Sequence, residues 1–264
     1  MTETAEPLPT SEVRTQFHSD LDAIKADTVR LAAMVTERIP WGTEILLGGD
    51  LAEAQALIDA DDDLDMLSLE LEERCYQNLV LQAPMAKDLR TIVTCLRLVS
   101  ELERSGDLMV NVAKAMRRLY GTEIDPKLRG LIARMGEESQ RLMRLAIDAF
   151  AEGDEGKAAA LDDMDDRLDE LHKEYIQAIF ESHRAGGVDL EAGVQLALVG
   201  RYYERIGDHA VNIGERVRYM VSGWLPEHTG AARVEGPRSV APGRPHVAGC
   251  RCIRGRRQSQ RDRR

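Results

Sequence analysis

Hydrophobic residues recur at three- and four-residue steps along the chain, which places them on one face of an α-helix. The clearest example lies between residues 86 and 120, where the apolar positions are Leu89, Ile92, Val93, Leu96, Val99 and Val110. Such a stripe is typical of a helix that packs into a hydrophobic core. The pattern therefore predicts a helical protein and names these residues as core candidates.

Proline, glycine and capping residues divide this pattern into six helices. Thr10-Ser11 can cap a first helix that runs toward Arg38. Pro40 is expected to kink or end it, because proline lacks an N–H donor and clashes with the preceding turn. The later helices are expected at about 51–81 and 86–120, after Pro126 to about 151, between 154 and 186, and from Asp189 to about 222.

The composition agrees with helices and excludes several classes of protein. Hydrophobic residues make up 43% of the 264 residues, enough for a core, whereas the 4% of aromatic residues disfavours a sheet protein. There is neither an apolar run long enough to span a membrane nor a secretion signal. The four cysteines fit neither a disulfide framework nor a zinc finger, so we expect a cytoplasmic protein.

Charge is divided unevenly along the chain. Residues 226–264 contain ten Arg, no Lys and three acids, a net charge of +7, which leaves −18 on residues 1–225. This tail has no Leu and cannot bury enough apolar surface to fold, so we expect it to be disordered. The simplest interpretation is a solvated appendage, and the alternative is an arm that contacts nucleic acid or anionic lipid. The acidic remainder would repel nucleic acid.

An internal repeat is the strongest feature of the sequence. The segment 103–107, Glu-Arg-Ser-Gly-Asp, recurs 101 residues later as Glu-Arg-Ile-Gly-Asp at 204–208. Upstream, residues 49–65 match residues 153–169 at a spacing of 104. Chance seldom preserves the order of two such matches, so we infer a duplicated unit of about 100 residues.

The fold class expected from these features is all-α, with two tandem pseudo-symmetric three-helix bundles followed by a disordered basic tail. The predicted segments are a flexible N-terminus at 1–10, repeats at 11–121 and 122–225, and the tail at 226–264.

Acidic residues four positions apart occur in both repeats and share a helix face. Glu103 continues the apolar stripe of Leu96 and Val99, so Glu103 and Asp107, four residues later, lie beside the packed side of the helix. Carboxylates crowded there would repel one another unless a cation bound them, and oxygen ligands suit Mg, Mn or Fe and are accepted by Zn. We therefore predict one metal site in each repeat, formed by Asp61, Asp65, Glu103 and Asp107, and by Asp165, Asp169, Glu204 and Asp208.

Other interpretations of these residues stay open. The acidic runs at 61–65 and 162–169 are also compatible with solvated helix faces. Gly106 and Gly207 lie inside helices, where glycine costs roughly 1 kcal/mol against alanine, and this suggests close approach to a neighbouring helix or to the site. We interpret Arg104 and Arg205 as surface partners. His209 is interpreted first as a hydrogen-bonded neighbour of the site and only second as a metal ligand.

The repeated Glu-Arg-x-Gly-Asp motif, the segment Gln-Ala-Pro-Met-Ala-Lys-Asp-Leu-Arg at 82–90 and the upstream acidic pairs resemble the PhoU family over about residues 11–224. The resemblance implies two three-helix bundles and iron or zinc clusters held by the eight acids already named. Carboxylate chemistry leaves manganese or magnesium as alternatives. Pro40 and the tail at 226–264 depart from the family pattern.

The resemblance also implies a function. Family members are cytoplasmic negative regulators of phosphate uptake and of the phosphate-starvation response, and many dimerise. They act between the ATP-binding phosphate ABC transporter and its sensor histidine kinase, at the inner face of the membrane, without a small-molecule substrate. We therefore expect a non-enzymatic regulator with these partners.

Two rival classes are considered beside this one. A metal-free helical adaptor would use the same bundle without bound ions. A carboxylate-bridged metalloenzyme would need a Glu-x-x-His on two helices, and the only related spacing, Asp169 to His172, has no counterpart in the first repeat.

Overall fold

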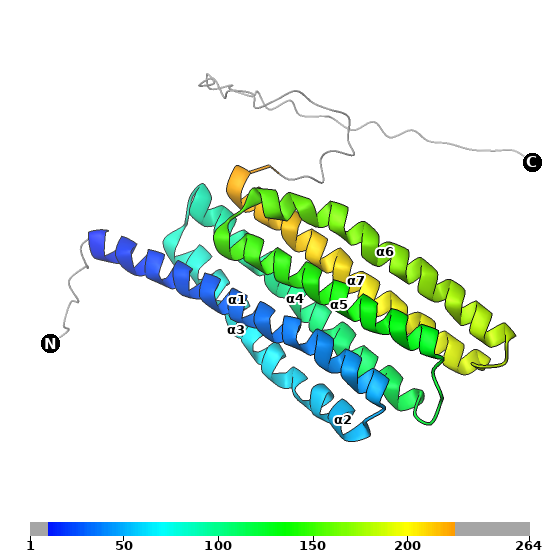
Figure 1. The fold of residues 1–264 in the computed structure, drawn as a ribbon. Coiled ribbons are helices and arrows are strands. Elements are labelled where there is room, and N and C mark those ends of the chain that lie inside the picture. The colour runs from blue at the N-terminus through cyan, green and yellow to red at the C-terminus, as the bar shows by residue number, and fades with distance from the viewer. Residues whose placement is uncertain (1–9, 225–264) are drawn as a thin grey trace, which may run out of the picture. The chain divides into compact units, whose positions relative to one another are not determined.

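The computed structural model describes residues 10–224, and every regular element within that range is an α-helix. The helices run lengthwise beside one another in an elongated bundle (Figure 1). Their bounds are α1 Thr10–Gly48, α2 Leu51–Asp59, α3 Asp61–Gln82, α4 Lys87–Arg118, α5 Pro126–Glu152, α6 Glu155–Arg184 and α7 Leu190–Ser222. The all-α prediction is confirmed. The predictions for residues 1–9 and for the tail at 226–264 lie outside the described residues.

Capping residues begin the helices where the sequence predicts. Asp50, Asp154 and Asp189 each accept hydrogen bonds from backbone N–H groups in the first turns of α2, α6 and α7. Gly153 ends α5 in the left-handed conformation that glycine adopts without strain. The loop between α4 and α5, at residues 119–125, contains the predicted division between the repeats.

Pro40 was predicted either to kink the first helix or to end it, and the second of these predictions is wrong. α1 continues through this proline to Gly48. Proline leaves the carbonyl of the residue four positions earlier without its helical donor. Here that carbonyl, of Thr36, accepts a 3.4 Å hydrogen bond from Nε2 of Gln140 in α5. A neighbouring helix therefore supplies the donor that Pro40 removes.

The predicted second helix is interrupted once, at Ala60, between α2 and α3. The guanidinium of Arg38, a buried side chain of α1, donates to the Ala60 carbonyl and forms a 2.5 Å ion pair with Asp61. The break thus places the positively charged guanidinium of Arg38 beside Asp61, the first residue of α3 and the first acid of the predicted site.

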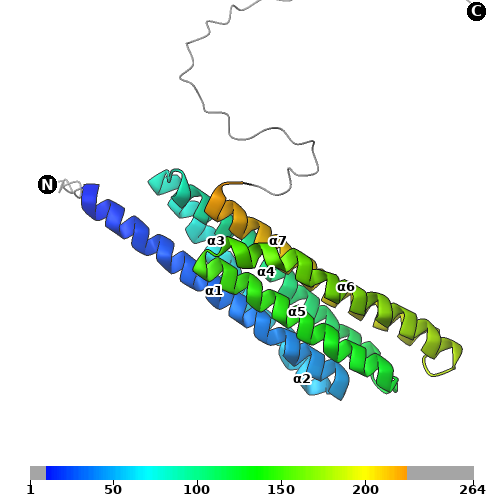
Figure 2. The ribbon, with the colours of Figure 1, turned by 45° about the horizontal axis from the view of Figure 1, so that its top comes forward.

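The two repeats share one hydrophobic core. In both, the third helix packs against the second, as α4 against α3 and α7 against α6. The repeats meet where α4 packs against α7 and where α1 packs against α5 (Figure 2). The α4–α7 contact is antiparallel, since Thr94 donates to the Arg216 carbonyl and Arg90 donates to the Met220 carbonyl. The buried residues of all seven helices form a single cluster.

The two repeated glycines lie where a side chain of a neighbouring helix packs directly against the backbone. A Cβ on Gly106 would lie 3.0 Å from Leu64 of α3, and a Cβ on Gly207 would overlap Asp165 and Leu168 of α6. The suggestion that the repeated glycine permits close approach of a neighbouring helix is therefore confirmed in both halves.

Gly214→Ala is expected to destabilise the protein, by about 1–3 kcal/mol, because the new Cβ would lie 2.9 Å from the Ala158 carbonyl oxygen and 2.6 Å from Leu161. Gly130→Ala in α5 is the matched control: nothing lies within 4 Å, so it should stabilise by about 0.5–1 kcal/mol through helix propensity. Urea unfolding measures both. Equal changes in the two variants would contradict the packing described here.

Candidate functional site: two acidic helix faces

The first acidic face lies between α3 and α4. Asp61 and Asp65 are one turn apart on α3, and Glu103 and Asp107 are one turn apart on α4. Burial raises the pKa of Asp65, and the charges of Asp61 and Asp107 raise it further. Burial also raises the pKa values of Glu103 and Asp107, with neighbouring acids of the face as the next cause. The four predicted acids are therefore close enough to repel one another.

These acids lie at the edge of the packed core. Asp65 and Asp107 are exposed, and Asp61 and Glu103 are half-buried. Arg38 compensates part of the charge from the inner side through its ion pair with Asp61. The face is thus acidic toward solvent and has one buried arginine behind it.

The second acidic face lies between α6 and α7. Burial raises the pKa of Asp165 to about 6, and the charges of Asp169 and Asp208 contribute next. Gly207 lets the Asp165 carboxylate approach the α7 backbone, which explains why this side chain is half-buried. The charges of Asp169 and Asp208 therefore act on Asp165, and the joint role of these acids as metal ligands stays a prediction.

Glu204 joins the second face through an arginine. Arg201, one turn earlier on α7, forms an ion pair with Glu204, and its other terminal nitrogen lies 3.9 Å from Oδ2 of Asp208. Oδ1 of Asp165 and Oε2 of Glu204 are buried and accept no hydrogen bond from any described residue. This face therefore contains two carboxylate oxygens whose bonding capacity is unused.

The carboxylate oxygens of this face are chemically suited to bind a cation, but their arrangement suits one only in part. Carboxylate oxygens with raised pKa values and two unsatisfied oxygens are what a hard or borderline metal ion would satisfy. Within residues 10–224, however, no three side chains of His, Cys, Asp or Glu converge closely enough to hold one ion. The eight-residue metal set remains a prediction, and binding would require these side chains to rotate toward one another.

His209 lies in the contact between the repeats and not on the acidic face. Its Nδ1 is 2.9 Å from the Ser105 hydroxyl, and its Nε2 is 3.9 Å from Glu101. Burial lowers its pKa, while Glu101 opposes that shift. The interpretation of His209 as a hydrogen-bonded neighbour agrees with this position. Arg104 and Arg205 are exposed, in agreement with a surface role.

Two arginines of the site were not identified from the sequence. Arg201 precedes Glu204 by three residues and Asp208 by seven, so helical spacing was a usable signal. Arg38 interrupts an apolar stripe that includes Leu31 and Val35, but nothing in the sequence indicates its partner 23 residues away.

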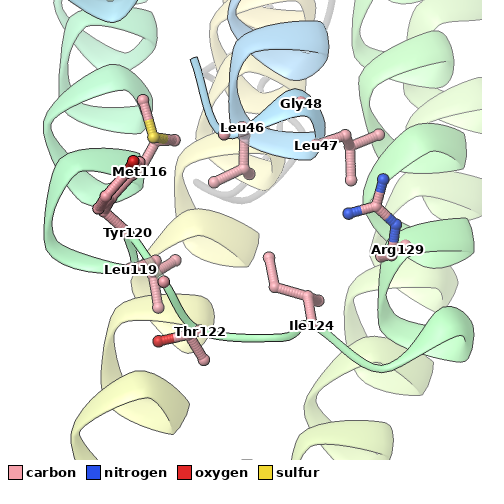
Figure 3. Close-up of a pocket in the computed structure, with 11 residues that line it drawn as sticks. Leu46, Leu47, Gly48, Met116, Leu119, Tyr120, Thr122, Ile124 and Arg129 are labelled. Carbon is pink, nitrogen blue, oxygen red and sulfur yellow. The ribbon is translucent and has the colours of Figure 1, made fainter. Parts of the chain in front are cut away.

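A separate cavity of about 370 Å³ opens where the C-terminal ends of α1 and α4 meet the start of α5. Figure 3 shows Leu46 and Leu47 of α1 between Met116 and Leu119 on one side and Arg129 on the other. None of the eight predicted acids lines it. The acidic faces and this cavity are therefore different features of the surface.

Comparison with known proteins identifies the fold. The sequence model of the PhoU domain matches residues 13–116 and 132–217, one match in each repeat. The chain belongs to the PhoU family. The resemblance inferred from the repeated Glu-Arg-x-Gly-Asp motif is thereby confirmed.

Named relatives and solved structures agree with this assignment. The phosphate-specific transport system accessory protein PhoU homolog 1 of Mycobacterium tuberculosis is 31% identical over 215 residues, 81% of this chain and 96% of the relative. Homolog 1 of Thermotoga maritima is 31% identical over 207 residues, 78% of this chain and 89% of the relative. The crystal structure of PhoU from Pseudomonas aeruginosa superimposes with a TM-score of 0.74 at 27% identity, covering 79% of this chain and all of that one.

Among the described residues of this PhoU-family chain, no helix is long and apolar enough to cross a membrane.

Asp165→Asn is expected to stabilise the protein in chelator at pH 7 and to have little effect at pH 4. The pKa of Asp165 is about 6 when folded, above its ordinary value of 3.8, so folding opposes ionisation. That cost is absent below pH 4 and fully present above pH 6. The measurement is the unfolding free energy of both proteins across this range. A difference between them that is independent of pH would contradict the crowding described here.

Proposed function

We propose that this PhoU-family chain is an accessory of phosphate-specific transport that represses phosphate uptake and the phosphate-starvation response. The observation that carries the proposal is the match of both repeats to the PhoU domain. Relatives that are named as accessory proteins of phosphate-specific transport align with 78–81% of the chain, which supports the same role.

In this proposal the chain acts as an adaptor without enzymatic activity. Its partners are the ATP-binding subunit of the phosphate transporter and the sensor histidine kinase, reached from the cytoplasm at the inner face of the membrane. A homodimer belongs to the same proposal. The long helices suit this role, because a rigid bundle presents extended faces to partners without closing around a substrate.

We further propose that the acidic faces hold cations, iron or zinc first and manganese or magnesium as alternatives. Asp165 Oδ1 and Glu204 Oε2 support this for the second face, since both are buried without a donor. A bound cation would neutralise the mutual repulsion of the carboxylates. Arg201 holds Glu204 and orients it beside Asp208, and Gly207 allows Asp165 to approach the same helix.

A metal-free adaptor is the second candidate, and a specific observation favours it. Arg38 and Arg201 already pair with Asp61, Glu204 and Asp208, so part of the negative charge is compensated within the protein. In that case the acidic faces would be recognition surfaces for a basic partner.

Deleting the gene, together with any paralogue, is expected to derepress phosphate-starvation promoters in medium rich in phosphate. The reason is that loss of the adaptor uncouples the kinase from the transporter. The measurement is a transcriptional reporter in the deletion strain, with the wild-type gene supplied on a plasmid as control. Reporter activity that stays at the repressed level in the deletion strain would show that the proposed role is wrong.

A further inference from the structure

The outer face of α3 presents a row of exposed hydrophobic side chains. Met66, Leu69, Tyr76 and Val80 are 63%, 69%, 55% and 81% exposed. They follow steps of three, seven and four residues, which aligns them along one side of the helix. We call these four residues the α3 outer face. Scattered exposed apolar residues are normal, but a row at coiled-coil spacing marks an interaction surface.

The duplication supplies an internal control for this face. At the spacing of 104 residues that relates the repeats, the equivalent positions on α6 are Glu170, Lys173, Phe180 and Arg184. Three of these four exposed residues are charged, as expected of a solvated helix. The apolar row therefore does not follow from the shared fold, since the second repeat keeps the same helix without it.

No described element covers the α3 outer face. Among residues 10–224, α3 packs only against α1, α2 and α4. Those contacts use the opposite side of the helix, where Leu64, Leu67, Leu71 and Cys75 are buried.

The charges around the face determine what can cover it. α3 carries seven acidic residues and one arginine, and that arginine is engaged by Asp27 of α1 in a 2.5 Å ion pair. Glu73 lies within the row, and Glu70 borders it. A partner must therefore combine apolar side chains with positive charge.

We propose that the α3 outer face docks a basic amphipathic helix of a partner protein. Apolar side chains of that helix would pack against Met66, Leu69, Tyr76 and Val80, while its Lys and Arg residues would pair with Glu70 and Glu73. A second copy of α3 would place these acids against each other, and an anionic lipid surface would repel them, so neither is the favoured occupant. This inference rests on the proposed accessory function, for which it names the recognition surface and the partner's chemistry.

The test uses the full chain and a synthetic 18-residue helical peptide with Leu on one face and Lys on the other. A peptide of the same composition in scrambled order is its control. Fluorescence anisotropy of labelled peptide measures affinity. The double variant Leu69→Ser/Val80→Ser should weaken binding of the amphipathic peptide at least tenfold. The matched variant Phe180→Ser/Leu190→Ser, which removes exposed apolar residues from the second repeat, should leave it unchanged.

Several results would overturn the proposal. These are absence of binding, equal binding of the two peptides, and equal weakening by the two double variants. A wild-type dimer in sedimentation that the Leu69→Ser/Val80→Ser variant loses would assign the face to a second copy. Binding to phosphatidylglycerol vesicles that the same variant loses would assign it to lipid.

The reporter strain separates this inference from the proposed function. If the deletion derepresses the reporter but Leu69→Ser/Val80→Ser restores full repression, the docking proposal fails and the function stands. If the peptide binds as expected but the deletion leaves the reporter unchanged, the face is a docking surface and the proposed function fails.

Discussion

The antiparallel packing of α4 against α7 is the contact on which the rest of the structure depends. It joins the repeats through buried hydrophobic side chains and through polar contacts that include His209 against Ser105 and Thr94 against the Arg216 carbonyl. α4 carries Glu103 and Asp107, and α7 carries Glu204 and Asp208, so the same contact fixes one half of each acidic face. Glycines at 106 and 207 then bring α3 and α6 close enough to complete the faces.

The carboxylates brought together in this way repel one another, and the two repeats compensate their negative charge differently. In the first, a buried arginine from α1 reaches Asp61 from behind. In the second, Arg201 lies half-exposed on α7 itself and leaves Asp165 Oδ1 and Glu204 Oε2 without partners. The duplication therefore preserved the carboxylates but not their counter-charges. This difference makes the second face the stronger candidate for a bound cation.

Much of this architecture is predictable from the sequence because its signals are local. Glycine, proline and capping aspartate residues predict where the helices begin and end, and the repeated motif predicts the pseudo-symmetry. The failures involve partners far apart in sequence. α1 continues through Pro40, where Gln140 donates to the Thr36 carbonyl from 104 residues away, and the helix predicted at 51–81 breaks at Ala60, where Arg38 donates to the carbonyl. Neither contact leaves a signal in the local pattern, and the same holds for the exposure of the α3 outer face.

The claim that the acidic faces hold cations is tested most directly by anomalous diffraction. Crystals of the full chain would be grown in Zn²⁺ without chelator, and data collected on both sides of the zinc absorption edge. The account predicts a peak between Asp165 and Asp208, with a second between Asp65 and Asp107. A map with no peak at either face, while Arg38 and Arg201 keep their carboxylate partners, would contradict it.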